Sequence, residues 1–412
     1  MQKKIAIIGC GASGMMAAIR AAGLGADVTV YEHAKPGKKI LSTGNGKCNL
    51  TNEDMKAEFF FTHAPKRLQT CLERFGKEDT KTFFRDLGLL LKEKNGYYYP
   101  LSEQASMVQQ ILLNELERLN IKLITDIAIR EILPCNKNKL SKSWTIVSDR
   151  NESSYDTVII ACGSKAAPKT GSDGSGYEYA KQLGHKLKPV LPSLVQLRCS
   201  DSYCKSLAGI RAESSIHIYH DNILISSEKG ELQLTDYGIS GIPVFQLSGA
   251  VNRYLYKNKK AQLIAHVDFL PQFNQDEWDD FIINRLSNMK NVTVERFFCG
   301  IINQKIMNLL IKLVKLNPNA SVVNTDRNML IKVFQMCRDI VFHIECSNGF
   351  DNAQVCTGGV DLNEVTDNLE SVYAPNIYFA GEILDVDGRC GGYNLQWAWT
   401  SGFIAGEAAA QL

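Results

Sequence analysis

Three glycines and one acid near the start of the chain have the types and the spacing that bind a dinucleotide. Gly9, Gly11 and Gly14 form a G-x-G-x-x-G motif, and Glu32 follows 18 residues after Gly14. In such a motif the first glycine permits a tight turn, the second lets the backbone approach a pyrophosphate, and the third allows the helix to pack closely. Glu32 has the spacing of a carboxylate that accepts hydrogen bonds from ribose hydroxyls. Because a carboxylate repels a 2′-phosphate, the motif favours the ADP half of FAD or NAD over NADP.

The residues around the motif predict the elements that hold it. Residues 4–8 are an apolar, β-branched run that is typical of a strand buried on both faces. Small helix-forming residues follow at 15–22, so a helix is expected whose first N–H groups and dipole face the phosphates. A second strand is predicted at 27–31, directly before the acid. The alternative interpretation is a glycine-rich turn that binds nothing.

A polar loop is predicted directly after this unit, at residues 35–52. Its glycines and small polar residues favour neither a stable helix nor a packed strand. We expect its backbone to wrap a flat polar ligand, with Lys39 and Lys47 available to phosphate or flavin oxygens. A surface loop without a ligand is the alternative.

Composition places the chain among globular proteins of two or three domains. It has 412 residues, of which 45% are hydrophobic and 22% charged, and its formal net charge is +2. This balance gives no reason to expect a nucleic acid or a membrane as partner. The histidines are few and no C-x-x-C spacing occurs, so no metal is expected. Twelve cysteines scattered singly indicate reduced thiols and a cytoplasmic protein. No run of about 18 apolar residues occurs, so no membrane-spanning helix is expected.

Periodicity divides the rest of the chain. Short alternating strands between 187 and 268 are typical of an antiparallel sheet or barrel, and amphipathic runs from 274 to 339 indicate helices. A polar hairpin tip is expected at 136–141. In the tail, residues 376–394 repeat the order strand, acid and glycine loop, followed by a helix. The tail is therefore expected to return to the first domain, an arrangement that favours a flavoprotein over a simple NAD dehydrogenase.

Several stretches together resemble the HI0933-like, or YhiN-like, family of FAD-dependent oxidoreductases. Members of the family include bile-acid-inducible 3-dehydro-bile-acid reductases and aminoacetone oxidases. The resemblance implies an α/β fold: a Rossmann-like, glutathione-reductase-type FAD-binding domain with an inserted antiparallel β-barrel-like domain and a helical cap. The matching stretches span nearly the whole chain, at residues 9–14 with Glu32, 37–52, 171–177, 238–241, 357–360 and 379–396.

The resemblance also implies domain limits and an FAD site. On this view the backbone of residues 391–394, at a helix N-terminus, lies by the N1–C2=O edge of the flavin, where N–H dipoles stabilise the charge of the reduced ring. Glu382 reaches the ribityl or phosphate side. The expected parts are the FAD-binding domain at 1–188, the β domain at 189–272, the cap at 273–339, and a return through the β domain to the FAD-binding domain at 340–412. The residues expected to bind FAD are Gly9, Gly11, Ala12, Ser13, Gly14, Glu32, Lys39, Ser42, Gly44, Gly46, Cys48, Asn49, Ala161, Gly163, Gly381, Glu382, Gly391, Gly392, Tyr393 and Asn394.

The expected catalytic residues are Tyr97, Arg389 and Tyr393. A tyrosine hydroxyl protonates a carbon or polarises a ketone, and an arginine holds a carboxylate or an oxyanion. Packing of Tyr97 in a hairpin, and a surface or phosphate contact of Arg389, are equally good readings. The predicted flavin loops contain Cys48, Cys162 and Cys390, which are expected to be buried and inert; a redox disulfide or a covalent flavin link is the alternative. No histidine is expected to be the catalytic base.

Three functions stay open on the sequence. The first hypothesis is reduction of a C=C bond conjugated to a ketone, of the 3-oxo bile-acid or steroid type, by hydride from reduced flavin with NAD(P)H as a transient electron donor. The second is an amine or aminoacetone oxidase that passes electrons to oxygen, which the missing second nucleotide domain favours. The third is a non-catalytic or RNA-modification-associated FAD-binding protein, which the absence of a basic patch disfavours. The expected partner is a small molecule, and the sequence gives no oligomeric state.

Overall fold

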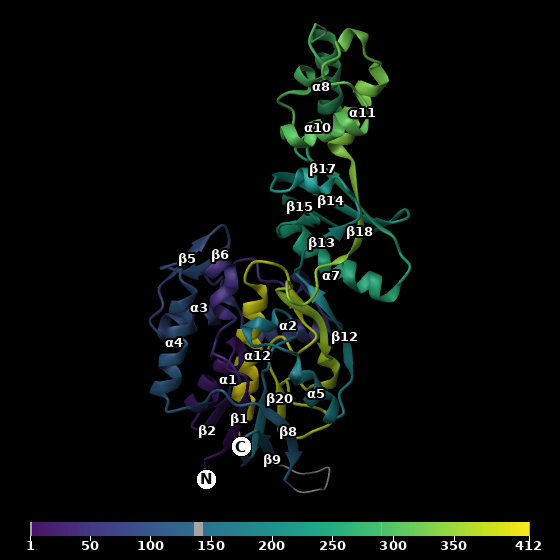
Figure 1. The fold of residues 1–412 in the computed structure, drawn as a ribbon. Coiled ribbons are helices and arrows are strands. Elements are labelled where there is room, and N and C mark those ends of the chain that lie inside the picture. Colours follow the sequence, from purple (N-terminus) through teal and green to yellow (C-terminus); the bar gives the residue numbers. More distant parts are fainter. Residues whose placement is uncertain (1, 136–142, 290, 412) are drawn as a thin grey trace. The chain divides into compact units, whose positions relative to one another are not determined.

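The chain folds into two compact units. The computed structural model describes residues 2–135, 143–289 and 291–411, so the hairpin tip expected at 136–141 lies outside the described residues. The first unit contains both ends of the chain, Met1–Pro192 and Phe350–Leu412, and the second is Ser193–Gly349 (Figure 1). Each unit encloses hydrophobic cores of its own.

A five-stranded parallel sheet forms the centre of the first unit. Ile5 and Ile7 pack into the core on one face of this sheet, and Ala6 and Ile8 into the core on the other face. Burial on both faces explains why this strand is an uninterrupted apolar run. The strand order is β20 (Ile377–Phe379), β11 (Thr157–Ile160), β1 (Lys4–Ile8), β2 (Asp27–Tyr31) and β7 (Lys122–Ile124).

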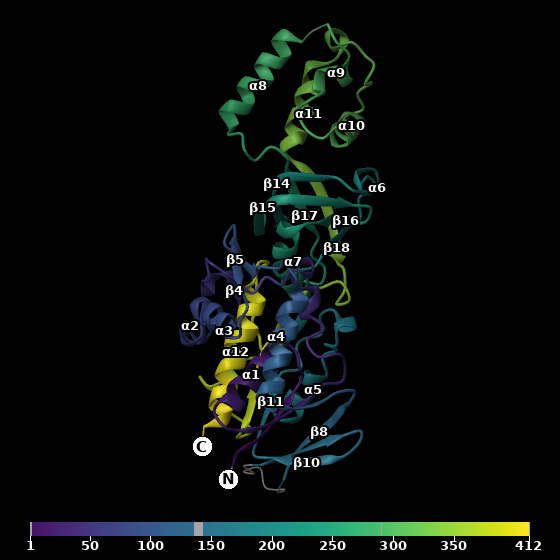
Figure 2. The same ribbon diagram turned by 90° about the vertical axis from the view of Figure 1, so that its left-hand side faces the viewer.

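Two layers cover this sheet. Helices cover one face, and Figures 1 and 2 show two of them, α1 (purple) and α12 (yellow), side by side. A three-stranded antiparallel sheet packs on the other face, where Trp144 and Ile146 share a core with Ile8. The helices are α1 (Ala12–Gly23), α4 (Ala105–Arg118) and α12 (Tyr393–Ala410), and the strands are β10 (Glu152–Tyr155), β9 (Trp144–Ser148) and β8 (Ile129–Pro134).

The contact between α1 and α12 depends on glycines one helical turn apart. A Cβ atom added at Gly402 would lie 2.4 Å from the carbonyl oxygen of Ser13, and one at Gly406 would lie 2.4 Å from the carbonyl oxygen of Ala17. The two helices therefore meet backbone to backbone. This contact joins the first helix of the chain to the last one.

Shorter elements complete the first unit. The helices are α2 (Pro65–Arg74), α3 (Lys77–Asp86) and α5 (Ser175–Gln182), with 3-10 turns at Ile40–Gly46, Ala57–Phe59, Pro168–Thr170 and Leu362–Glu364. The paired strands are β3 (Thr51–Asn52) and β5 (Leu91–Lys94) on either side of β6 (Tyr97–Pro100), β4 (Phe60–Phe61) with β21 (Asp387–Gly388), and β12 (Leu187–Ser193) with β19 (Val355–Val360).

A closed barrel of six antiparallel strands forms the second unit together with a helical segment. Every second residue of β14 points inward, among them Ile216 and Ile218. Trp278 and Phe334 of the helical segment belong to the same continuous core as the barrel. The barrel order is β13 (Leu197–Cys199), β16 (Gly238–Ser240), β15 (Ile223–Thr235), β14 (Arg211–His220), β17 (Leu263–Asp268) and β18 (Ile340–Ser347). The helices are α6 (Cys204–Leu207), α7 (Ile242–Lys257), α8 (Gln275–Asn288), α9 (Val294–Phe298), α10 (Gln304–Leu313) and α11 (Arg327–Arg338), with a 3-10 turn at Val322–Asn324.

The predicted fold class is confirmed. The first unit is a Rossmann-type α/β domain completed by the C-terminal strand and helix, and the inserted segment contains the antiparallel barrel and the helices. Among the helices in the described ranges, none is long and apolar enough to cross a membrane.

Candidate functional site

The glycine motif lies at the carboxyl end of β1. Gly9 has φ +104°, and a Cβ there would lie 2.5 Å from the carbonyl oxygen of Ala161, so the turn requires glycine. A Cβ at Gly14 would lie 1.9 Å from the carbonyl oxygen of Gly9. Gly11 differs, since a Cβ there would meet no atom of the described residues within 4 Å. The space over Gly11 is therefore open, at the N-terminus of α1, where Ala12 and Ser13 begin the helix without a side-chain cap.

The Glu32 carboxylate closes the motif from the end of β2. It is buried, its Oε2 accepts a hydrogen bond from the N–H of Cys10 at 2.8 Å, and its Oε1 accepts one from the N–H of Ala34 at 2.8 Å. These bonds hold the carboxylate beside the glycine loop. Since a carboxylate has about four lone-pair sites, lone pairs are left for ribose hydroxyls.

Three loops converge around Glu382. Its Oε2 accepts hydrogen bonds from Nζ of Lys39 at 2.7 Å and from Oγ of Ser164 at 2.9 Å. The three residues follow β2, β11 and β20, and the carboxyl ends of parallel strands are where α/β sheets bind ligands. The same turns contain Ala161, Gly163 and Gly381. Lys39 was expected to be available to phosphate or flavin oxygens; in this structure it forms an ion pair with Glu382.

The loop after Lys39 bends back on itself. The Ser42 hydroxyl donates to the carbonyl oxygen of Lys39 at 2.8 Å. Gly44 and Gly46 have φ of +55° and +81°, so the backbone turns twice within three residues. Its other predicted lysine, Lys47, pairs with the carboxylate of Glu103 at 2.8 Å.

Cys48 and Asn49 continue this loop into the interior of the unit. Both are buried, and burial raises the pKa of the Cys48 thiol to about 12, so the thiol is protonated and inert at neutral pH. Asn49 lies within contact distance of the position that a Cβ at Gly392 would occupy. The burial of Cys48 agrees with the expectation for this cysteine, whereas Cys162 and Cys390 are only half-buried.

The glycine pair of the tail packs directly on that loop. Gly392 precedes α12 with φ +91°, and a Cβ there would lie 2.7 Å from the carbonyl oxygen of Thr51. The Nδ2 of Asn52 donates to the carbonyl oxygen of Gly391 at 2.9 Å. Asn394 fixes the same turn, because its Oδ1 accepts from the N–H of Gly388 at 2.8 Å and its Nδ2 donates to the carbonyl oxygen of that residue at 2.9 Å. The two glycine loops therefore form one structural unit.

The three predicted catalytic residues lie together at this turn. A Cβ at Gly391 would lie 2.4 Å from the ring of Tyr97, and the Tyr97 hydroxyl has no hydrogen-bond partner among the residues that the structure describes. The Arg389 guanidinium lies over the Phe59 ring, 5.6 Å from its centre. The Tyr393 hydroxyl donates to a backbone carbonyl at 3.1 Å, and burial raises its pKa to about 12.

A buried acid of the same loop was missed by sequence reasoning. Asp385 is 0% exposed, and its Oδ2 accepts hydrogen bonds from Nδ1 of His63 at 2.7 Å and from the N–H of His63 at 3.1 Å. Its Oδ1 has no partner in the described part of the chain, and burial raises the pKa of the carboxyl. The available signal was an aspartate within the apolar run 383–386.

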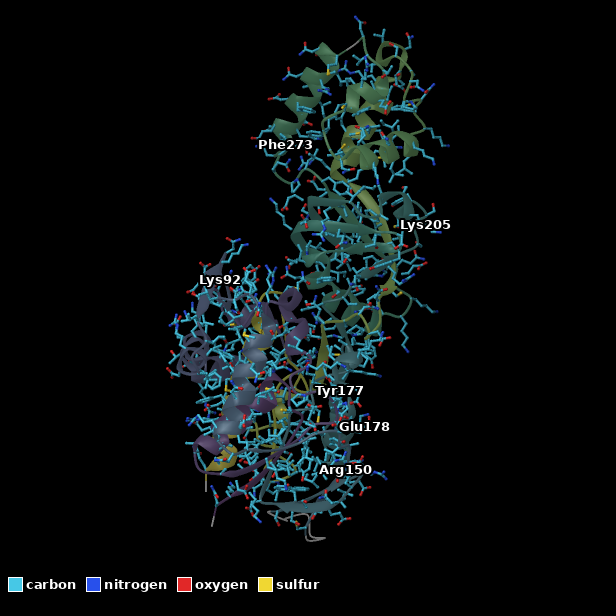
Figure 3. The ribbon with its side chains drawn as sticks, turned by 60° about the vertical axis from the view of Figure 1, so that its left-hand side comes forward. Lys92, Arg150, Tyr177, Glu178, Lys205 and Phe273 are labelled. Carbon is cyan, nitrogen blue, oxygen red and sulfur yellow. The ribbon has the colours of Figure 1, made fainter. Side chains whose placement is uncertain are left out.

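A buried tyrosine of α5 adds a second unpartnered polar atom nearby. Figure 3 labels Tyr177 beside Glu178; the tyrosine is buried, whereas its neighbour is exposed. The Tyr177 hydroxyl has no hydrogen-bond partner in the described ranges, and it interacts electrostatically with Glu382 and Asp385. Two buried polar atoms without protein partners are a common feature of sites that hold a polar ligand or ordered water.

The family follows from comparison with known proteins. Residues 3–408 match the family described as HI0933-like protein Rossmann domain. The chain belongs to this family.

Two kinds of relatives are found for this HI0933-like protein. It is 41% identical over 99% of both chains to the 3-dehydro-bile acid delta(4,6)-reductase of Clostridium scindens. It is 26% identical over 96% of both chains to the ribosomal RNA dihydrouridine synthase of Haemophilus influenzae. A solved structure, the Mycobacterium smegmatis Sdh1 complex in the apo form, matches 99% of this chain and 68% of its own at a TM-score of 0.51 and 12% identity, which shows a shared fold.

These findings confirm the predicted family and the predicted class, an FAD-dependent oxidoreductase. The structure brings the predicted FAD residues together around the carboxyl ends of β1, β2, β11 and β20 and at the start of α12. The roles of the individual residues belong to the proposals below. Within the described ranges, no group of three or more His, Cys, Asp or Glu side chains could hold a metal ion.

The buried Asp385 leads to a prediction about stability in this HI0933-like protein. Burial raises the pKa of this carboxyl above its ordinary value of 3.8, so the folded protein binds its proton more tightly than the unfolded chain does. The stabilisation from that proton is complete below pH 3.8 and is lost as the pH rises through the raised pKa. Asp385→Asn is therefore expected to unfold at a higher temperature than the wild type at pH 7, and the difference should shrink on acidification. Thermal unfolding of both proteins over a pH series measures this.

A control with the opposite sign is available in the same unit. Hydrogen bonds from Lys47 and Lys92 lower the pKa of Glu103 to about 2, so its contribution is present above pH 4.5 and is lost as the pH falls through 2. Glu103→Gln should therefore lower the unfolding temperature slightly at pH 7, since the pair is exposed to solvent. If Asp385→Asn also lowers the unfolding temperature at pH 7, the hydrogen bonds from His63 outweigh the cost of burying the charge of Asp385.

Proposed function

We propose that the first unit binds FAD, with the ADP half at the start of α1 and the flavin ring beside the turn at residues 388–394. The open space over Gly11, the uncapped start of α1 and the buried Glu32 support the position of the ADP half. The unpartnered atoms of Tyr177 and Asp385 support a polar ligand in the interior. The residues proposed to hold FAD are those that the sequence indicated.

We propose that this flavoprotein reduces a C=C bond conjugated to a ketone in a 3-oxo bile acid or steroid. One observation carries the proposal: 41% identity over 99% of both chains to a protein named 3-dehydro-bile acid delta(4,6)-reductase. FAD, when bound and reduced, supplies the hydride, and NAD(P)H is the proposed electron donor. The chain's own contribution is to orient the ketone and to provide a proton. Tyr97, Arg389 and Tyr393 lie at the turn beside which the flavin is proposed to bind, and they are the proposed substrate contacts.

A second candidate is reduction of uridine in ribosomal RNA. The relatives of 26% and 25% identity from Haemophilus influenzae and Escherichia coli, both named ribosomal RNA dihydrouridine synthases, favour it. The higher identity to the bile-acid enzyme and the near-neutral net charge of +2 rank it second, because RNA binding relies on a basic surface. On the single cysteines we further propose a cytoplasmic protein.

An anaerobic titration tests the proposed function. The FAD-loaded protein is first reduced with NADH or NADPH, and the visible flavin absorption is followed. A 3-oxo-4,6-diene bile acid is then added, and recovery of the absorption with stoichiometric reduced product is the expected result. Oxidation by air alone, with reduction by aminoacetone, would make the protein an oxidase. Dihydrouridine formation in an rRNA transcript, without turnover of the bile acid, would establish the second candidate.

A further inference from the structure

A histidine and a buried aspartate form a hydrogen-bonded pair next to the proposed flavin position. The His63 imidazole is bonded through Nδ1 to Oδ2 of Asp385, and its side chain is 40% exposed. The aspartate is 0% exposed. Because Nδ1 bonds to the buried carboxylate, the orientation of the imidazole is fixed while Nε2 takes no part in that bond. An imidazole oriented in this way can donate a proton from Nε2.

Strand pairing places this imidazole beside the turn that contains the predicted catalytic residues. In the antiparallel pair of β4 and β21, Phe61 lies opposite Asp387 and Phe60 opposite Gly388. His63 follows this strand and lies across from Asp385 for that reason. The N–H of Arg389 donates to the carbonyl oxygen of Phe59 at 3.0 Å, so the pairing continues into the turn.

We propose that His63 is the proton donor of the reduction and that Asp385 is its positioning residue. The inference rests on the proposed function, because it needs a substrate that accepts a proton.

The proposed step is balanced in atoms and electrons. The hydride forms a C–H bond at one carbon of the C=C bond, and the electron pair of the broken π bond moves toward the ketone. The proton on Nε2 of His63 then forms the C–H bond at the other carbon. The imidazolium becomes neutral imidazole and regains its proton from solvent, which its exposure allows. Asp385 keeps the Nδ1–H directed at its own Oδ2 and stabilises the imidazolium.

The barrel unit contains a similar pair that serves as a matched control. Both the N–H and Nδ1 of His343 bond to the carboxylate of Asp201, at 2.6 Å and 2.8 Å. There each carboxylate oxygen has a partner, whereas Oδ1 of Asp385 has none among the described residues. A His–Asp pair thus also occurs in the other unit, and His343→Gln reproduces the loss of such a pair.

The first test compares His63→Gln with His343→Gln. Both variants should retain FAD and should be reduced by the nicotinamide at the wild-type rate. Reoxidation by the 3-oxo-4,6-diene bile acid should slow by about 10²- to 10⁴-fold in His63→Gln alone, the usual contribution of a general acid. Wild-type reoxidation in both variants overturns the role of His63 and leaves the proposed function standing. A wild-type protein that the bile acid cannot reoxidise overturns both.

Two further readouts separate chemistry from structure. Imidazole added to His63→Ala should restore part of the reoxidation rate, and a folded, FAD-loaded variant without rescue contradicts the proposal. In the second, ¹⁵N-labelled histidine NMR of the FAD-free protein should show a proton on Nδ1 of His63 in the wild type, directed at Asp385. Asp385→Asn should change the tautomer populations while the His343 signal stays the same. An unchanged His63 signal would remove Asp385 from the positioning role.

Discussion

Gly11→Val is expected to give a folded protein that no longer retains FAD. Among the described residues, no atom outside the adjoining ones lies within 4 Å of a Cβ at this position. Its φ of −83° is accessible to every residue, so the fold accommodates the side chain. The added atoms would occupy the space in which a pyrophosphate approaches the start of α1. We expect the Kd for FAD to rise at least about 100-fold, equivalent to about 2.8 kcal/mol. Flavin absorption per protein after purification, and titration of the apoprotein, measure it.

The control for this variant lies at the other end of the same helix. A Cβ at Gly23 also meets no atom within 4 Å in the described part of the chain, apart from its own helix backbone, and this residue is far along α1 from the glycine motif. Gly23→Val should therefore retain FAD at the wild-type ratio. If Gly11→Val purifies with full flavin occupancy, the pyrophosphate does not lie at this helix start.

The sequence identifies the nucleotide-binding elements because their signals are local. The apolar run of β1, the glycines and the acid after β2 lie within thirty residues, and each position is constrained by its immediate neighbours. The glycines at 9 and 14 are needed because backbone atoms of Ala161 and Gly9 approach them closely. Such steric demands leave a residue-type pattern that a single sequence reveals.

Long-range pairs leave no comparable pattern. Lys39 and Glu382 are 343 positions apart, and His63 and Asp385 are 322 apart. The second pair depends on the two-residue pairing of β4 with β21, which is too short to give a periodic signal. Lys47 illustrates the same limit, because its partner Glu103 comes from a segment that nothing in the loop sequence indicates. Closure of the barrel likewise requires β13 to pair with both β16 and β18.

The helix of the tail has close backbone contacts that its amino-acid composition does not reveal. Its small residues indicated a helix, yet which of its glycines contact another backbone depends on the position of α1. Only the structure distinguishes Gly406, whose Cβ would lie 2.4 Å from the carbonyl oxygen of Ala17, from a glycine with open space such as Gly23. This difference determines whether replacing the glycine with alanine raises or lowers the stability of the protein.

Gly406→Ala is expected to destabilise the protein, whereas Gly23→Ala is not. Alanine favours a helix over glycine by about 1 kcal/mol, so propensity alone predicts that both variants gain stability. At Gly406 the added Cβ would also lie 2.8 Å and 3.0 Å from Cα and C of Ala17, so only a shift of α1 against α12 relieves the contact. Overpacking of this kind costs about 1–3 kcal/mol or more, which exceeds the propensity gain.

Chemical unfolding of the two variants measures the difference. Because α1 and α12 each begin at a glycine loop of the proposed FAD site, Gly406→Ala should also bind FAD more weakly than Gly23→Ala does. Equal or greater stability of Gly406→Ala would mean that the two helices separate at little cost. The glycine loops at their N-termini would then be held together by the contacts of Asn52 and Thr51 with Gly391 and Gly392 rather than by the helix pair.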